Sequence, residues 1–374
     1  MPASPLVQHA GHGYAALRHA VSPQGWRGAL RVDLHRAGIA APLRVGAAVA
    51  LVFVIGGLAG LQDVVGFAAL GALVSAFCRP DPYPVRSGRL LVLGVGITAS
   101  VGIGAALGAL EAPAAVDIAA ISVLAGAAAY LIWTLHIVGP GAVVFVFAAV
   151  GAESFAHDAG DVRRAVAVTA GGAVIGMLAA LAPWILQWIR PHRGTGSAAA
   201  PRESLWVTLT RAPHRNLVWR ATRIAVAGAL GAAVAVSLGL AHPMWATMGA
   251  VATMQGIGYH VAVHRGVQRL LGNVAGALLA AGLLALPLGY WGTVAAIIVF
   301  QTLAEIASTV NYALTSVAVT PMALLMTGLG AGLAPSVALD RVLDTALGIV
   351  VGIVIAALTI NGADARQLRT NNAD

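Results

Sequence analysis

Arginine is the residue type through which this chain could act on another molecule. All 22 of its Lys and Arg residues are arginine, and several recur at one spacing. A guanidinium binds a carboxylate through two parallel hydrogen bonds, so such a set could gather organic anions. The alternative is that each arginine reaches a lipid phosphate. The recurring pairs, 179 or 180 residues apart, are Arg44 and Arg223, Arg86 and Arg265, and Arg89 and Arg269, of which the first four residues are our candidates for substrate binding.

Polar and aromatic residues inside apolar segments form a second candidate set. An amide or ionisable side chain in hydrocarbon is costly unless it faces a cavity or a partner. Glu305 fits either a proton-coupling carboxylate or a helix cap, and we favour the cap. Aromatic side chains can stack on a solute ring or anchor the chain at the membrane interface, and the two interpretations are equally good. The candidate solute contacts are Trp245, Gln255, Asn311 and Tyr312.

Motifs of the common enzyme and metal-site classes are not found in the sequence. No G-x-S-x-G and no Walker A motif occur, and a chain without lysine lacks the P-loop lysine. Cys78 is the single cysteine, which excludes a disulfide within one chain. His260 and His264 have metal-compatible spacing, but the glutamate and third ligand of a zincin are missing. We expect no enzymatic activity, no metal site and no cofactor.

The composition indicates what positions these residues. Hydrophobic residues make up 59% of the chain and charged residues 10%, which is typical of a bundle exposed to lipid. The 45 glycines favour close contact between membrane helices. The recurring arginines indicate that the second half repeats the first. We therefore expect an all-α integral membrane protein with about twelve transmembrane helices in two parallel six-helix repeats.

Apolar runs define the twelve segments, because a helix needs about 20 such residues to cross the hydrocarbon. The first repeat, residues 43–189, is predicted to contain Leu43–Leu61, Val64–Cys78, Leu90–Leu110, Ala114–Trp133, Val138–Ala152 and Val162–Ile189. The second repeat, residues 219–360, is predicted to contain Trp219–Leu240, Pro243–Gly258, Gly266–Leu286, Gly289–Ala307, Tyr312–Gly330 and Val337–Ile360.

The remaining segments are predicted to be cytoplasmic. They are the arm of residues 1–42, the linker of residues 190–218 and the tail of residues 361–374. Residues 204–215 form an amphipathic pattern with Trp206 and Leu209 inward, and residues 26–36 are the counterpart in the arm. With both termini inside, 19 of the 22 arginines lie in or beside cytoplasmic segments, as the positive-inside rule requires. This placement, with a net charge of +8, favours anionic lipid over nucleic acid as a partner.

Two predicted helices in each half are short or interrupted at matching positions. The second helices, Val64–Cys78 and Pro243–Gly258, are short, and the fifth helices open or break at Gly139-Pro140-Gly141 and at Thr320-Pro321. Such segments indicate a transport site, because a helix end inside the membrane leaves backbone groups free for a solute. The alternative is that these helices are merely tilted, shielded or kinked.

One stretch of the second half carries a family resemblance. His242-Pro-Met-Trp-Ala-Thr-Met-Gly-Ala-Val-Ala-Thr-Met-Gln255, followed by Arg265 and Arg269-Leu-Leu-Gly-Asn-Val-Ala-Gly276, resembles the fusaric acid resistance protein-like (FUSC) membrane domain. That family is grouped with aromatic acid exporters and is distantly related to aluminium-activated malate transporters. The resemblance is weaker in the first half, where Asp63-Val-Val-Gly66 stands in place of the His-Pro-x-Trp motif.

The resemblance implies export of small organic, often aromatic, carboxylate anions, driven by an ion gradient. We expect a multi-pass protein of a bacterial inner membrane. Its expected partners are the solute and anionic lipids, with homo-oligomerisation left open. Two alternatives remain at this point: a passive organic-anion channel, and a membrane scaffold that transports nothing.

Overall fold

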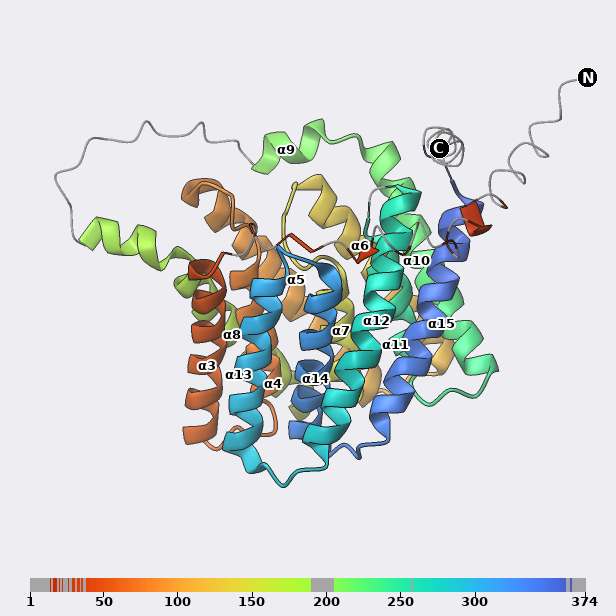
Figure 1. Ribbon diagram of the computed structural model, residues 1–374. Helices are drawn as coiled ribbons and strands as arrows, with labels where there is room; N and C mark the ends of the chain where they lie inside the picture. The colour runs from red at the N-terminus through yellow and green to blue at the C-terminus, as the bar shows by residue number, and fades with distance from the viewer. Residues whose placement is uncertain are drawn as a thin grey trace, which may run out of the picture.

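The computed structural model describes residues 38–189, 205–256 and 258–360, with Asp364 and isolated positions of the arm before residue 38. All regular secondary structure in these residues is helical, and the helices form one bundle (Figure 1). The linker up to residue 204 and most of the arm and tail lie outside the described residues. The expected amphipathic segment of residues 26–36 is described only at isolated positions.

Nine helices of the described residues are long and apolar enough to cross a membrane. This confirms the expected class, a multi-pass all-α membrane protein. Their bounds are α3 Ala40–Leu58, α5 Tyr83–Ala109, α6 Ala114–Thr134, α8 Ala159–Ile189, α10 His214–Ser237, α12 Tyr259–Leu284, α13 Gly289–Ala307, α14 Tyr312–Ala331 and α15 Val337–Leu358.

Three further helices of the bundle are too short to cross it. They are α4 (Val65–Ala72), which continues into the 3₁₀ helix η2 (Leu73–Ala76), α7 (Val143–Glu153) and α11 (Pro243–Met254). Twelve helical residues rise only about 18 Å, against about 30 Å of hydrocarbon. Every residue of α11 after Pro243 is buried, and most of α4 is buried too. Both second helices are therefore short and interior, as the sequence predicts.

The fifth helices differ from the prediction in one place. α7 begins directly after Gly139-Pro140-Gly141, with Gly141 at φ +94°, as expected. α14, however, runs unbroken through Pro321, so the predicted break at Thr320-Pro321 is wrong. Thr320 Oγ1 donates to the Ser316 carbonyl at 2.9 Å, and Gly276 of α12 lies against this turn. Packing by α12 thus supports the helix where proline removes a backbone hydrogen bond.

Corresponding helices of the two halves contact each other in the same pairs. α4 packs against α8 as α11 packs against α15, and α5 packs against α7 as α12 packs against α14. α6 packs against α10, and α13 packs against α3. Glycine allows the closest of these contacts, since an added Cβ would overlap the neighbouring backbone. The matching glycines face alanines: Gly172 on Ala68 and Gly176 on Ala72 in the first half, Gly348 on Ala246 and Gly352 on Ala250 in the second.

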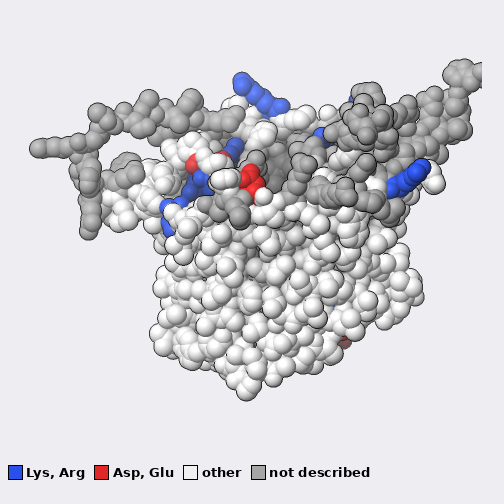
Figure 2. Space-filling view, viewed as in Figure 1, with Lys and Arg blue, Asp and Glu red and all other residues white. Residues whose placement is uncertain are grey.

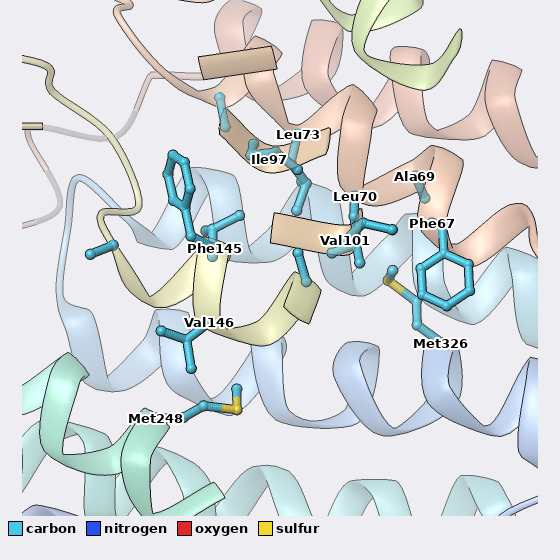
Figure 3. Close-up of a cluster of buried hydrophobic side chains, with 14 of the residues drawn as sticks. Phe67, Ala69, Leu70, Leu73, Ile97, Val101, Phe145, Val146, Met248 and Met326 are labelled. Atoms are coloured by element: carbon cyan, nitrogen blue, oxygen red, sulfur yellow. The ribbon is translucent and has the colours of Figure 1, made fainter. Parts of the chain in front are cut away.

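The hydrophobic core runs through both halves. It contains Phe67 and Leu70 of α4, Phe145 of α7, Met248 of α11 and Met326 of α14 (Figure 3). The short helices α4, α7 and α11 therefore share one core with α14.

Charge is concentrated at one end of the bundle. We call this the arm end, because α3, the helix that follows the arm, begins there, as do α5, α10 and α12 (Figure 1). Figure 2 shows nearly all visible charged side chains at this end and an almost uncharged surface below it. α8 and α15 begin at the other end, which we call the distal end.

The amphipathic segment before α10 is shorter than predicted. α9 covers Leu205–Arg211, and α10 begins at His214, directly after Pro213. Proline disfavours a helical residue before it, which divides the predicted segment. Leu209 packs against the core as expected, whereas Trp206 is 72% exposed, and its inward orientation, toward the membrane, stays a prediction.

Candidate functional site

A cavity of about 360 Å³ lies among the short helices and the second half of the bundle. Its volume falls in the range of small-molecule sites. The 3₁₀ helix η2, α7, and the loop that contains Gly139 and Pro140 form one side, and α11 to α15 form the other. The cavity lies beside the loop that precedes α7. α7 has not yet begun at this position, so a loop stands where helical turns would otherwise fill the space.

The side formed by the first half is almost entirely apolar. Leu73, Val143, Val144 and Phe147 line it, and Met322 continues this surface on α14. This wall can accommodate the hydrocarbon part of a solute, since burial of apolar area contributes about 25 cal/mol per Å².

The other side is cationic. Arg265 and Arg269 project from α12 and Arg341 from α15, and Arg79 reaches in from the loop after η2. Arg269 and Arg341 are 4% and 2% exposed, so both charges are removed from bulk solvent. Among the described lining residues, Glu305 is the single acidic side chain. The cavity therefore has excess positive charge.

Arg79 and Glu305 form an ion pair between the loop after η2 and α13. Gln301, one turn earlier on α13, donates from Nε2 to Glu305 Oε1 at 2.9 Å. Burial and the nearby charges of Arg86 and Arg44 lower the pKa of Arg79. Glu305 is thus a buried ion-pair partner, and our preferred interpretation of it as a helix cap is wrong. No described ion pair joins Glu305 to the arginines of α12 or α15.

Arg265 lies on Tyr312, the first residue of α14. The guanidinium carbon is 4.3 Å from the ring centroid, and Arg265 Nε donates to the Ala252 carbonyl at 3.1 Å. The Tyr312 hydroxyl interacts with both Arg265 and Arg269. Cation–π and hydrogen-bond contacts therefore fix the two guanidinium groups of α12 beside one aromatic ring.

Arg341 is held at the distal part of the cavity by an aromatic stack. Its guanidinium lies 4.9 Å from the Trp245 ring, and Trp245 stacks on His242 at 4.0 Å between centroids. Arg341 Nη1 is 3.7 Å from Met248 Sδ. Burial lowers the pKa of His242, which favours the neutral imidazole in this stack.

Polar contacts fix the helices that carry these arginines. Asn273 Nδ2 donates to the Arg341 carbonyl at 3.0 Å, which joins α12 to α15. Thr320 Oγ1 lies 3.2 Å from Asn273 Oδ1 and shares its one proton between this oxygen and the Ser316 carbonyl, and Ser316 Oγ donates to the Arg269 carbonyl at 3.3 Å. α12, α14 and α15 are thereby held together at the backbone of two cavity arginines.

The candidates named from the sequence occupy different places. Arg265 and Tyr312 line the cavity, and Trp245 supports Arg341. The Gln255 carboxamide lies against Gly141, at the turn before α7. Asn311 caps α14, since its Oδ1 accepts from Ala313 N at 2.7 Å and its Nδ2 donates to the Ala29 carbonyl at 3.2 Å.

The other three arginine candidates lie outside this cavity. Arg44 and Arg86 are close enough to Arg79 to affect its charge. Arg223 lines a separate cavity of about 120 Å³ with Arg220 and Asp364. The repeat spacing thus does not bring all four arginine candidates together.

Sequence reasoning missed part of the cationic side. Arg341 was one of three arginines that the positive-inside count left unexplained, and an arginine inside a predicted span was the signal for a cavity. Arg79 was counted only as part of a loop. Arg269 was recognised as a repeated residue but was not chosen as a contact.

The fold and the cavity define a class, namely a multi-pass helical membrane protein with a cationic interior cavity. Residues 220–355 match the family model described as fusaric acid resistance protein-like, which confirms the resemblance over that region. The matched region includes Arg265, Arg269, Tyr312 and Arg341. Comparison with curated proteins and with solved structures gives no match.

Proposed function

We propose that this protein is a membrane transporter that exports small organic carboxylate anions, especially aromatic ones, through the central cavity. One observation carries the proposal: Arg265, Arg269 and Arg341 line an interior cavity whose acidic side chain, Glu305, is already paired with Arg79. Buried positive charge of this kind is costly unless an anion binds to it.

The cavity chemistry favours a carboxylate attached to a ring. Each charge-assisted hydrogen bond from a guanidinium contributes about 1.5–3 kcal/mol. The apolar wall around Phe147 and Val144 suits the ring face. Fusaric acid, named in the description of the matching family, is an aromatic carboxylic acid of this kind.

We further propose that the bundle consists of two parallel six-helix repeats. In this arrangement α4, α7 and α11 are shortened members of the set of twelve. Two findings support it: the shared pairs of packed helices, and the glycine–alanine contacts that recur between α4 and α8 and between α11 and α15. Parallel repeats place a solute site near their common axis, among the short helices.

In the proposed orientation the arm end faces the cytoplasm of a bacterial cell and the bundle lies in the inner membrane. The concentration of arginine at the starts of α3, α5, α10 and α12 supports it under the positive-inside rule. Arg44 and Arg86 then lie beside Arg79 at the cytoplasmic entrance, where they attract the anion. Arg223 has a different role, next to Asp364 and the lipid head groups.

We propose that Glu305 couples solute transport to an ion gradient. A proton on its carboxylate weakens the ion pair with Arg79 and frees that guanidinium for the solute. Conduction through a passive channel does not require protonation of Glu305. Proton dependence therefore distinguishes the proposed transporter from a channel.

Uptake into everted membrane vesicles tests the proposal. Vesicles that contain the wild-type protein should accumulate radiolabelled benzoate or fusaric acid, and collapse of the proton gradient should abolish accumulation. Arg211→Gln, which changes an exposed arginine of α9, is the matched charge control. Equal uptake by vesicles with and without the protein, across a panel of aromatic acids, would reject transport of this class. Uptake that only equilibrates, whatever the proton gradient, would establish the channel.

A further inference from the structure

A second cavity, of about 380 Å³, lies toward the distal end of the bundle. The starts of α4 and α8 form it together with the end of α7 and the last turns of α14. It is as large as the central cavity. We call it the distal cavity.

The distal cavity shares an aromatic wall and a guanidinium with the central one, but its lining holds two acids, Asp63 and Asp161, against the one arginine Arg164. Phe67 and Phe155 form an edge-to-face pair in its wall, with ring centroids 5.0 Å apart. Arg164 supplies a guanidinium, and its Nη2 donates to Asp63 Oδ2 at 2.8 Å. Both side chains of this ion pair are about half exposed, so water competes for each of them.

An apolar layer about one helical turn thick separates the two cavities. Phe147 lines both of them. On the path from α4 into η2, Leu70 lines the distal cavity and Leu73 the central one. On α14, Met326 lines the distal cavity and Met322 the central one. Leu70, Leu73 and Met326 belong to the buried cluster drawn in Figure 3.

We infer that the distal cavity is a second, weaker carboxylate site, in which Arg164 binds the solute and Asp63 competes with it. This inference rests on the proposed transport function, because it makes the distal cavity the place from which the solute leaves. An exposed ion pair contributes little, so a solute carboxylate can replace Asp63 at Arg164. Asp63 also repels the solute, whereas Glu305 in the central cavity is neutralised by Arg79. A solute that passes Phe147 thus moves from a stronger site to a weaker one.

Equilibrium binding of radiolabelled benzoate to the purified full-length protein tests the inference without requiring transport. The wild type should show a tight and a weak phase. Arg164→Gln should remove the weak phase and leave the tight one unchanged, whereas Arg164→Lys should retain it. Asp63→Asn should strengthen the weak phase about threefold or more. Arg163→Gln is the matched control, because Arg163 is exposed and does not line the cavity.

A wild-type isotherm that shows the tight phase alone, or a weak phase that survives in Arg164→Gln, would overturn the distal site. Size exclusion confirms that each variant is folded. A missing tight phase together with a weak phase that responds to Arg164 and Asp63 as expected would reject the central site and support the distal one. The two proposals therefore fail in different ways.

Discussion

The two halves of the bundle share a packing plan but differ in where their recurring arginines point. Arg89 and Arg269 occupy matching places in the sequence. Arg89 donates to Asp81 Oδ2 at 2.8 Å in a buried ion pair, and it lines none of the described cavities. Arg269 has no acidic partner among the described ion pairs, and it lines the central cavity. A recurring residue therefore stabilises the bundle in one half and is available to a solute in the other.

The fifth helices explain why the cavity is asymmetric. α14 has 20 residues and brings Tyr312 to the guanidinium groups of α12. α7 has 11 residues, and the loop before it borders the cavity with Val138, Gly139 and Pro140. The second half thus supplies Arg265, Arg269 and Arg341, and the first half supplies most of the apolar surface together with Arg79.

The largest effect on solute affinity is expected at the arginines that line the central cavity, in comparison with Arg89, which does not line it. The double variant Arg269→Gln/Arg341→Gln should weaken the apparent affinity for benzoate about a hundredfold or more, since each lost charge-assisted contact is worth about tenfold. Arg89→Gln should change the affinity less than about twofold, because Arg89 contacts Asp81 instead. Competition binding on size-exclusion-purified protein measures both. Equal losses in the two variants would mean that the halves contribute alike.

Stability should respond alike at the matching glycines. A Cβ at Gly172 would lie 1.8 Å from the Ala68 carbonyl oxygen, and one at Gly348 would lie 1.9 Å from the Ala246 carbonyl oxygen. Gly172→Ala and Gly348→Ala should each destabilise the protein by about 1–3 kcal/mol, because the helices must separate. Thermal unfolding in detergent measures this. Gly171→Ala is the control, since nothing lies within 4 Å of an added Cβ there. A loss in one half alone would argue against equivalent packing.

Removal of Glu305 should sharpen the charge difference between the halves. Glu305→Gln removes the acidic group from the cavity and frees Arg79. Benzoate affinity should rise about threefold to fivefold, and the proton dependence of uptake should weaken. Gln301→Glu is the opposite change, because it adds an acid one turn earlier on α13, and it should reduce affinity. Unchanged proton dependence in Glu305→Gln would remove this residue from the coupling step.

The smallest effects are expected at Arg44 and Arg223, whose surroundings differ despite their repeat spacing. Arg44 lies near Arg79 and Arg86, so Arg44→Gln relieves repulsion and should leave the melting temperature unchanged or slightly higher. Arg223 is attracted by Asp364, so Arg223→Gln should lower it slightly. Each substitution should change the free energy of unfolding by less than about 1 kcal/mol. Differential scanning fluorimetry detects the sign, and shifts of the same sign would show that the two surroundings are alike.

Much of the fold could be predicted because membrane helices leave a strong hydrophobic signal. The all-α membrane class and the short interior helices α4 and α11 were predictable from the lengths of apolar runs. The continuity of α14 at Pro321 was not, because it depends on contacts with α12 that no local pattern contains.

The candidate site was predicted less completely than the fold. Arg265 and Tyr312 were found by repetition and by polarity inside an apolar segment. Arg341 has no partner at the repeat spacing, and its role depends on Trp245 and His242, which are about 100 residues away in the sequence. The repeat spacing identifies residues that occur in both halves. A solute site can also depend on residues that occur in only one half.

Anomalous scattering from 4-bromobenzoate tests the central claim most directly. The wild-type protein crystallised with this acid should give a bromine peak in the central cavity, on the apolar side near Phe147, with the carboxylate toward Arg265, Arg269 and Arg341. The peak should disappear in crystals of Arg269→Gln/Arg341→Gln and persist in those of Arg211→Gln. A bromine peak only on the lipid-facing surface or beside Arg223, with the central cavity free of it, would contradict the account.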